Sequence, residues 1–308
     1  MNIIQRKIKT FKSVKRPVWR WIAKQSFFKY VPDKTAVKIL YANVFNEKLN
    51  LKNPKTYNEK LNWMKLYDRN PLYATLVDKA EVKKYVAEII GEEYIIPTFG
   101  VYDTWDKIDF ASLPNEFVIK CTHGSGDVVI CKDKSNFDFE SAKAKITKSL
   151  KKNYYKVCRE WAYKNVKPRI IIEKYVDEIG SKSLKDFKFY TFNGKCELLL
   201  LVSDRGVVNS CVKMDFFDIN LNWLPIKKSH INFYNDKKFA RPLNYEKMIE
   251  IAEKLSKNFV HLRVDLYNAN GKIYFGELTF YPAGGMDPFE PKIWDEKIGD
   301  LLILPKKQ

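Results

Sequence analysis

The chain has 308 residues, 45% of them apolar, which is enough to bury a core in one large domain or in two or three smaller units. Its longest aliphatic stretches, residues 198–202 and 301–304, are too short to span a bilayer, and no signal peptide is predicted. The five cysteines are odd in number and form no CxxC pair, so the pattern indicates neither a zinc site nor a disulfide framework and predicts a reduced, cytoplasmic protein.

The formal net charge is +18, and half of it comes from residues 1–30, which contain nine Lys or Arg and no acid. A surface this basic attracts polyanions such as nucleic acid, anionic lipid or nucleotide phosphates. No RNP, zinc-finger or basic-zipper pattern is present, so nucleic acid is not favoured as a partner.

The basic N-terminal segment, residues 1–33, also carries the apolar side chains Trp19, Trp21, Ile22, Phe27 and Phe28. One interpretation is an interfacial helix on an anionic membrane surface. The other is a helix whose aromatic side chains pack on the body of the protein. The pattern leaves both open.

Residues 34–75 are predicted to be mainly helical, and residues 78–90 form a clearer amphipathic helix that ends at Gly91. After Pro97 the pattern changes to strands. The predicted strands are 117–120, 128–131, 170–172, 187–192, 195–203, 261–266 and 272–279, with helices over 139–151 and around 248–255. Asn193-Gly194 predicts a hairpin between two of these strands.

A second hairpin is predicted across Asn268-Ala-Asn-Gly271. A three-residue loop would pair Asn268 with Lys272 and set Asp265 opposite Phe275, with Glu277 as its diagonal neighbour. Strand alternation then places the following residues on one face: Arg263, Asp265, Ile273, Phe275, Glu277 and Thr279. A two-residue Asn270-Gly271 loop would put the two acids on opposite faces.

Two carboxylates on one patch of sheet repel each other unless a cation lies between them. Oxygen ligands of this kind suit Mg²⁺, which usually binds one or two carboxylates together with substrate phosphates. The alternative for Asp265 and Glu277 is a solvent-facing strand pair with an Arg–Asp salt bridge.

Lys120 closes an apolar strand and is followed by Gly124-Ser125-Gly126, a loop rich in backbone N–H groups of the kind that cradle phosphates. The loop is neither a Walker A motif nor a Rossmann fingerprint, and a simple Gly-Ser turn is the alternative. Lys188 shares one strand face with Asp186 and Tyr190, where a solvated lysine is the alternative.

Taken in order, these segments resemble the ATP-grasp fold and, more narrowly, its TupA-like family of teichuronopeptide biosynthesis. The resemblance runs from about Asn53 to Leu304. Its most specific stretches are residues 53–60, 117–126, 170–175, 186–189, 264–267 and 275–285. It implies an α+β ATP-grasp fold, in which two α+β subdomains clasp ATP, with a helical basic N-terminal extension. The expected boundaries are 1–33, 34–115, 116–176 and 177–308.

The resemblance also implies roles for individual residues. Lys120, Gly124, Ser125, Gly126 and Lys188 are implied to contact ATP phosphates, and Glu173, Lys174, Tyr175 and Val176 to form the hinge that reads adenine. For His123, in the same loop, three roles stay open: a phosphate contact, gating of the site, or a loop residue with no special role. Arg263, Lys188 and Lys120 are the implied catalytic cations, and Asp265, Glu277 and Thr279 the Mg²⁺ ligands. Thr279 stands where many ATP-grasp ligases have Asn, and Asp177 and Glu178 both remain candidates for the ribose contact.

The implied function is an ATP-dependent ligase that activates a carboxylate as an acyl phosphate and joins it to an amine. The family points to surface-polysaccharide biosynthesis, with a sugar uronate or amino acid as the carboxylate. The competing interpretations are a sugar transferase of the same pathways, a kinase on the ATP-grasp scaffold, and a polyanion-binding protein without activity. The sequence contains no D-x-D motif of the kind that metal-dependent sugar transferases often carry.

Overall fold

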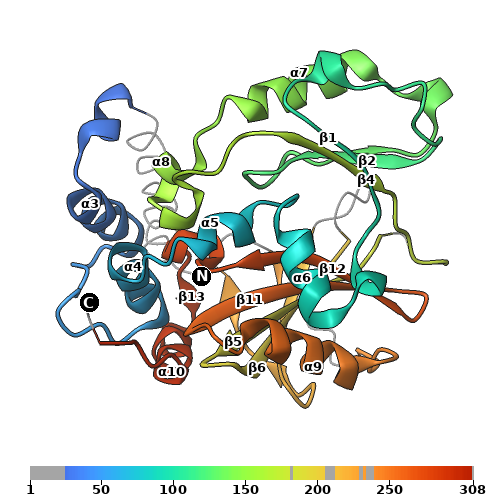
Figure 1. The fold of residues 1–308 in the computed structure, drawn as a ribbon. Coiled ribbons are helices and arrows are strands. Elements are labelled where there is room, and N and C mark those ends of the chain that lie inside the picture. Colours follow the sequence, from blue (N-terminus) through green and yellow to red (C-terminus); the bar gives the residue numbers. More distant parts are fainter. Residues whose placement is uncertain (1–24, 181–182, 205–211, 229–231, 234–238, 307–308) are drawn as a thin grey trace, which may run out of the picture. The chain divides into compact units, whose positions relative to one another are not determined.

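Figure 1 shows the chain as a computed structural model, which describes residues 25–180, 183–204, 212–228, 232–233 and 239–306. The chain divides into two compact units, each assembled from separated stretches. We call residues 1–69, 153–164 and 281–308 the helical unit, and residues 70–152 and 165–280 the sheet unit.

The helical unit is built mainly from short helices. Its elements are η1 (Ser26–Tyr30), α3 (Asp33–Phe45), α4 (Tyr57–Tyr67), α8 (Tyr154–Cys158), η5 (Trp161–Tyr163), η6 (Pro282–Gly285), β13 (Phe289–Glu290) and α10 (Ile293–Leu301). Helix α4 begins at a capping box, because the Thr56 side chain accepts from the Glu59 backbone N–H while the Glu59 side chain accepts from the Thr56 N–H.

Three polar side chains on one face of α4 hold the turn formed by η6. Asn62 donates to the carbonyl oxygen of Gly285 at 2.7 Å, and Lys65 donates to that of Gly284 at 2.6 Å. Asn58 donates to the carbonyl oxygen of Asp287 at 3.2 Å. The turn has positive φ at Gly284 and Gly285, so these buried side chains satisfy carbonyl groups that a regular helix would pair internally.

Phe28 resolves part of the ambiguity at the N-terminus. Its side chain is 1% exposed, and the Arg159 guanidinium lies 5.2 Å from its ring centre. For Phe28 the packing interpretation is therefore confirmed. Trp19, Trp21 and Ile22 lie outside the described residues. Within the described ranges, none of the helices combines the length and the apolar content needed to cross a bilayer.

The sheet unit holds most of the strands. Its helical elements are α5 (Leu72–Val77), α6 (Val82–Ile90), η2 (Glu92–Tyr94), η3 (Trp105–Lys107), η4 (Lys134–Asn136), α7 (Phe139–Leu150) and α9 (Tyr245–Ser256). Its first strands are β1 (Thr98–Tyr102), β2 (Phe117–Cys121), β3 (Val129–Cys131) and β4 (Ile170–Lys174). The later ones are β5 (Asp186–Phe192), β6 (Lys195–Ser203), β7 (Lys213–Asp218), β8 (Trp223–Leu224), β9 (Lys227–Lys228), β10 (Asn232–Phe233), β11 (His261–Ala269) and β12 (Lys272–Thr279).

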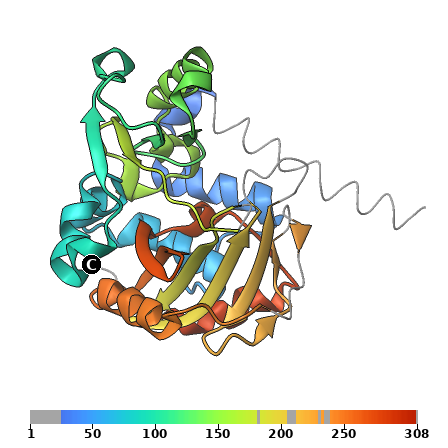
Figure 2. The ribbon, with the colours of Figure 1, turned by 90° about the vertical axis from the view of Figure 1, so that its right-hand side faces the viewer.

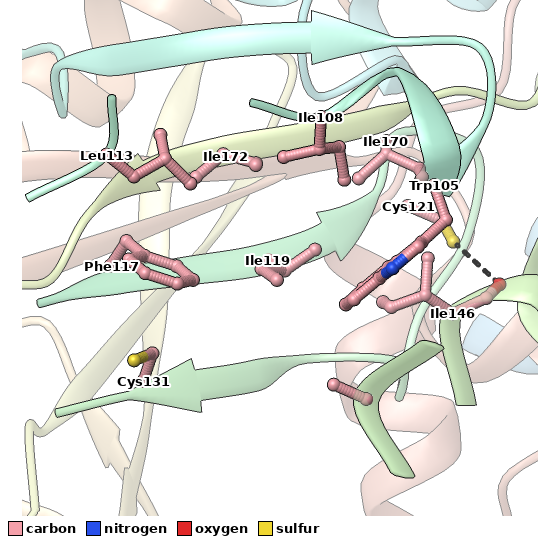
Figure 3. Packing of buried hydrophobic residues seen from close by; sticks show 11 residues of the cluster. Trp105, Ile108, Leu113, Phe117, Ile119, Cys121, Cys131, Ile146, Ile170 and Ile172 are labelled. Atoms are coloured by element: carbon pink, nitrogen blue, oxygen red, sulfur yellow. Dashed lines mark hydrogen bonds between the residues drawn. The ribbon is translucent and has the colours of Figure 1, made fainter. Parts of the chain in front are cut away.

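The first sheet has the strand order β1-β4-β2-β3, with each neighbouring pair antiparallel. One face of it packs on α7. Figure 3 shows Phe117, Ile119 and Ile172 on this face beside Trp105 and Ile146, all of them buried. The side chains on the other face include Lys120 and Glu173, so the charged residues of these strands lie on the face away from α7.

The second sheet has the strand order β10-β7-β6-β5-β11-β12. Helix α9, orange in Figure 2, covers one face with the buried residues Met248, Ile251 and Leu255. On β11 the residues Leu262, Val264 and Leu266 alternate with Arg263 and Asp265, so the charged residues lie on the face away from this apolar packing. The predicted strands are confirmed, with ends that differ by a few residues at most.

His261 is a buried imidazole whose pKa makes stability depend on pH. Its Nδ1 donates to the Thr191 carbonyl oxygen at 2.7 Å, and its ring stacks on Phe192. Burial, together with the Arg263 charge, lowers the pKa of His261 to about 4 although the hydrogen bond to Thr191 opposes this. The unfolded chain therefore binds a proton near pH 6.5 that the folded chain does not take up until about pH 4.

Above about pH 6.5 we expect protonation of His261 to have no effect on the free energy of unfolding. As the pH falls from 6.5 to 4, it should lower this free energy by about 3 kcal/mol. His261→Gln, which does not titrate, should flatten this part of the pH profile. Urea unfolding of both proteins at several pH values measures the difference. Parallel profiles for the two proteins would contradict the expectation.

Candidate active site

A row of three ionised side chains crosses the second sheet. Asp265 on β11 lies directly opposite Lys188 on β5 and directly opposite Glu277 on β12. Lys188 Nζ contacts the Asp265 carboxylate and lies 2.7 Å from Asp186 Oδ2. The exposed fraction of Asp265 is only 1%, so this contact is shielded from water.

Arg263 bridges the acids in this row. Its Nε and Nη2 donate to the two oxygens of Asp265 at 2.6 and 2.7 Å, and Nη2 also donates to Glu277 Oε1 at 2.8 Å. The same Nη2 reaches Thr279 Oγ1 at 3.0 Å. The structure thus brings together all four hairpin residues that the sequence singled out.

The register that produces this arrangement differs from the predicted one. The turn has two residues, Asn270 and Gly271, both with positive φ, and Ala269 pairs with Lys272. The prediction of a three-residue loop was therefore wrong. A two-residue loop was expected to separate Asp265 from Glu277, but one extra residue on β12 restores their pairing, since the register shifts between Asp265 and Leu266.

The shift also corrects the face assignment on β12. Ile273 and Phe275 were predicted to lie beside Glu277, but they pair with residues on the opposite face and are buried there. Leu278, also buried, lies on that opposite face too. Apolar residues at spacings of two and then three are a sequence signal for one extra residue between Phe275 and Leu278, because alternation in a regular strand keeps to even spacings.

Opposing effects set the ionisation of the two acids. Burial raises the pKa of Asp265 to about 6 although Arg263 and Lys188 lower it, which still leaves the carboxyl ionised at neutral pH. Burial also raises the pKa of Glu277, but the charges of Lys79, Lys188 and Arg263 outweigh it and hold that pKa well below its usual range. Both carboxylates are therefore available as anionic ligands.

The side chains of Asp265, Glu277 and Thr279 fit a magnesium ion that is bound together with substrate phosphates. Across the described part of the chain, no group of three or more His, Cys, Asp or Glu is placed to hold a metal by itself. Asp265 and Glu277 supply two facing carboxylates, and the Thr279 hydroxyl donates to Glu277 Oε1 at 3.3 Å. Two carboxylates and a hydroxyl suit Mg²⁺ when substrate phosphates complete its coordination.

A second charged cluster lies on the free face of the first sheet. Glu173 on β4 is buried between Lys120 on β2, which its Oε2 contacts, and Lys83 on α6, whose Nζ lies 2.5 Å from Oε1. Lys83 Nζ also donates to the Ile96 carbonyl oxygen at 2.7 Å and to Thr98 Oγ1 at 2.6 Å. Burial raises the pKa of Glu173, but the two lysines outweigh it and lower that pKa.

A pocket of about 330 Å³ opens beside this cluster and is lined by Lys83, Thr98, Val101 and Ile171, among others. Val101 and Ile171 are cross-strand partners, so the pocket has an apolar floor with a charged edge. Lys83 was not among the predicted site residues. Its sequence signal is weak, because a lysine in an amphipathic helix normally faces solvent.

The predicted hinge begins while the chain is still part of β4, since Glu173 and Lys174 both belong to the strand. The Lys174 N–H donates to the Pro97 carbonyl oxygen at 2.9 Å, and Lys132 Nζ lies 5.2 Å from the Tyr175 ring centre. Beyond Val176, Asn270 accepts from the Ile179 N–H at 2.9 Å and donates to the Asp177 carbonyl oxygen at 3.3 Å. The hairpin turn therefore holds the segment that follows the hinge.

Lys79, which was also not among the predicted site residues, links the glycine loop to the neighbourhood of Glu277. Its Nζ donates to the Gly124 carbonyl oxygen, its N–H donates to that of Thr122 at 3.1 Å, and its charge lowers the pKa of Glu277. His123 is buried, and its Nε2 lies 3.1 Å from the Lys152 carbonyl oxygen. Within the loop, Ser125 and Gly126 are the exposed residues, so their backbone is the part open to a ligand.

We expect Lys79→Met to loosen residues 122–127. A hydrogen bond from a charged donor contributes about 1.5–3 kcal/mol, so amide exchange in the loop should quicken at least tenfold. In the wild type, exchange should slow when an ATP analogue binds. Hydrogen-exchange mass spectrometry measures both effects, with Lys148→Met on the exposed face of α7 as the control. Equal exchange in all three proteins, with and without nucleotide, would refute a mobile loop held by Lys79.

Comparison with known proteins gives the following matches. The family model described as TupA-like ATPgrasp matches residues 59–303. None of the curated proteins matches the chain.

Among solved structures, D-alanine–D-alanine ligase from Bacillus anthracis complexed with ATP is similar at 16% identity and a TM-score of 0.40, over 74% of this chain and 65% of that one. N5-carboxyaminoimidazole synthetase from Staphylococcus aureus complexed with ADP is similar at 14% identity and a TM-score of 0.32, over 67% of this chain and 44% of that one. The ATP-grasp ligase PsnB complexed with minimal precursor is similar at 9% identity and a TM-score of 0.41, over 80% of this chain and 66% of that one. The chain thus spans less than two thirds of each of these structures.

Proposed function

The chain belongs to the TupA-like ATP-grasp family, and we propose that it is an ATP-dependent carboxylate–amine ligase that forms an amide through an acyl phosphate. The observation that carries the proposal is the row of Lys188, Asp265 and Glu277 with Arg263 bound across it. Such a set of charges suits phosphoryl transfer, which depends on positioning and on neutralising negative charge and needs no enzyme nucleophile.

In the proposed reaction, the γ-phosphoryl group of ATP passes to a carboxylate oxygen, which yields ADP and an acyl phosphate. An amine nitrogen then attacks the acyl carbon, phosphate leaves, and the amine loses a proton. Arg263 and Lys188 would stabilise the charge on the phosphoryl group during transfer. Asp265, Glu277 and Thr279 would hold Mg²⁺, which supplies positive charge at the phosphates when bound.

The charged cluster on the first sheet would bind ATP through its phosphates and its adenine. Lys120 and residues 124–126 would contact the phosphates, while residues 173–176 would read adenine beside the pocket at Val101 and Ile171. Lys83 is an additional candidate for this part of the site, because it already holds Glu173. In this proposal residues 116–176 and 177–308 are the two subdomains that clasp ATP.

The sequence resemblance to a family of teichuronopeptide biosynthesis motivates a substrate from surface-polysaccharide biosynthesis. We propose a uronate sugar or an amino acid as the carboxylate, and an amino acid, amino alcohol or amino sugar as the amine. The product would be an amide on a bacterial capsule-type polysaccharide or on its sugar precursor. The protein would then work in the cytoplasm, near the inner face of the membrane.

A screen of ADP release tests this function. Uronates and amino acids are offered as carboxylates with a panel of amines, Mg²⁺ and ATP, and Glu277→Gln serves as the inactive control. We expect ADP release that depends on both substrates, and a hydroxamate when hydroxylamine replaces the amine, because it traps an acyl phosphate.

Each competing function predicts a different outcome. A phosphorylated product that survives hydroxylamine would identify a kinase, and sugar transfer without ADP formation would identify a sugar transferase. Salt-sensitive polyanion binding that persists in Glu277→Gln, with no ATP turnover in the wild type, would identify a binding protein. Any of these results would replace the ligase proposal.

Attachment to an anionic membrane through the basic N-terminal segment is part of the proposal. Because Phe28 belongs to the core of the helical unit, the appropriate truncation removes residues 1–24 only, and with them eight of the nine cationic side chains. Each such charge adds about 1 kcal/mol near an anionic surface at low salt. We expect the full chain to float with phosphatidylserine vesicles, the truncated chain to remain in solution, and neither to bind neutral vesicles. Equal flotation of both chains would exclude the segment as an anchor.

A further inference from the structure

The pairing of β11 with β12 changes register once along its length. Next to the turn, Ala269 opposes Lys272, and the pairing proceeds regularly to Leu266 opposite Phe275. The next pair is Asp265 opposite Glu277. Gly276 is therefore an extra residue without a partner position on β11, that is, a β-bulge.

If β12 continued past Phe275 in regular register, the site would not form. In a regular continuation Gly276 would oppose Asp265, and Glu277 would oppose Val264, whose side chain is fully buried on the apolar face. The Glu277 carboxylate would then lie on the face that carries Ile273 and Phe275. Burying an unpaired carboxylate there would cost several kcal/mol.

Only glycine fits at the bulge, for a reason of space. A Cβ at position 276 would lie 2.9 Å from the Asp265 carbonyl oxygen and 3.2 Å from Cε2 of Tyr267. The first neighbour is backbone and cannot rotate away, so a side chain at 276 must displace the main chain at Asp265. Gly276 does not have positive φ, so this contact and not its backbone conformation requires glycine.

We infer that Gly276 is a positioning residue of the metal site: its bulge brings the Glu277 carboxylate onto the face of Asp265, and its missing side chain lets the two strands approach. The inference rests on the proposed function, because it assigns Gly276 to the magnesium-binding half of that site. β12 is the edge strand of its sheet, so the bulge disturbs no further strand.

Three variants distinguish a change in the geometry of the metal site from a general loss of protein stability. Gly276→Ala keeps the extra residue but pushes on Asp265. Deleting Gly276 leaves the glutamate four positions after Lys272, just as Ala269 lies four positions after Asp265, so a regular ladder would again set the two acids opposite each other. Gly271→Ala is the matched control, because it strains the same hairpin through its φ of 81° while its Cβ would meet only Leu243 Cδ1, at 3.5 Å.

The measurement is the calorimetric affinity for a non-hydrolysable ATP analogue with and without Mg²⁺, beside the thermal midpoint of each variant. We expect Mg²⁺ to increase the affinity for the analogue in the wild type, in Gly271→Ala and in the deletion variant. In Gly276→Ala, the factor by which Mg²⁺ increases this affinity should be at least tenfold smaller than in the wild type. An unchanged gain from Mg²⁺ in folded Gly276→Ala would overturn the inference and leave the ligase proposal standing. A wild type whose nucleotide binding does not respond to Mg²⁺ would remove the proposed metal site, and the inference with it.

Discussion

Replacing Glu277 by Gln is expected to reduce Mg²⁺-dependent ADP formation by at least 10²–10³-fold while leaving the protein folded. The carboxylate lies directly opposite Asp265, and its side chain is 31% exposed, so the amide loses the negative charge without leaving a deeply buried group unpaired. Steady-state ADP release over a range of Mg²⁺ concentrations measures the effect, and circular dichroism verifies the fold.

The equivalent change at Asp265 is expected to cost both activity and stability. Asp265 is buried and contacts both Lys188 and Arg263, so Asp265→Asn leaves a buried lysine and a partly buried arginine without their shared anion. Breaking a buried ion pair costs about 3–5 kcal/mol. The burial of Asp265 therefore makes Glu277→Gln the cleaner test of the metal site.

The exposed Glu296→Gln on α10 is the control for losing one carboxylate, and it should behave as the wild type. Near-normal activity of folded Glu277→Gln would remove Glu277 from the metal site. Near-normal activity of both Glu277→Gln and Asp265→Asn would leave the ligase proposal without its mechanism.

Arg263→Ala is expected to reduce kcat by about 10³-fold and to change the KM for ATP only a few-fold. The Arg263 guanidinium lies among Asp265, Glu277 and Thr279, where a transferring phosphoryl group would pass, and a charge that acts on the group in transfer affects kcat more than ground-state binding. Single-turnover ADP formation under saturating ATP separates chemistry from product release.

Arg263→Ala also removes the cation that bridges Asp265 and Glu277, so we expect Mg²⁺ to raise the melting temperature of this variant more than that of the wild type. Arg263→Lys is the matched control, since it keeps the charge but loses the forked contact with Asp265, and it should retain part of the activity. Thr279→Ala should be the mildest of the four hairpin changes, because a neutral hydroxyl contributes less than a carboxylate to binding Mg²⁺. A rise in KM with an unchanged kcat in Arg263→Ala would assign Arg263 to nucleotide binding instead.

The sequence by itself determined the faces of β5 and β11 on which the charged residues lie. Side chains alternate along a strand, so Asp186 and Lys188 were assigned to one face of β5, and Arg263 and Asp265 to one face of β11, before any partner strand was known. The hairpins followed from Asn-Gly turns, which tolerate positive φ. The motifs around Lys120, Asp265 and Glu277 were enough to identify the ATP-grasp resemblance.

Only the tertiary structure decided the contacts that cross between elements. Lys79 and Lys83 read as ordinary polar residues at the start of a helix, and their partners Gly124 and Glu173 lie far along the chain. Phe28 was ambiguous because a basic aromatic segment suits a membrane surface and a protein core equally well. Local periodicity contains no information about such partners, which depend on how separate elements pack.

The register of β11 against β12 shows the same limit within a single hairpin. The turn residues specify the pairing near Asn270 and Gly271, but the bulge at Gly276 arises where Ile273, Phe275 and Leu278 all bury on one face while Glu277 stays with Asp265 on the other. Periodicity assigns a face within each strand, whereas the energy of burying apolar side chains and pairing charges decides how two strands align. The metal site predicted from sequence therefore depends on a one-residue irregularity whose position is decided by the packing of apolar side chains and the pairing of charges.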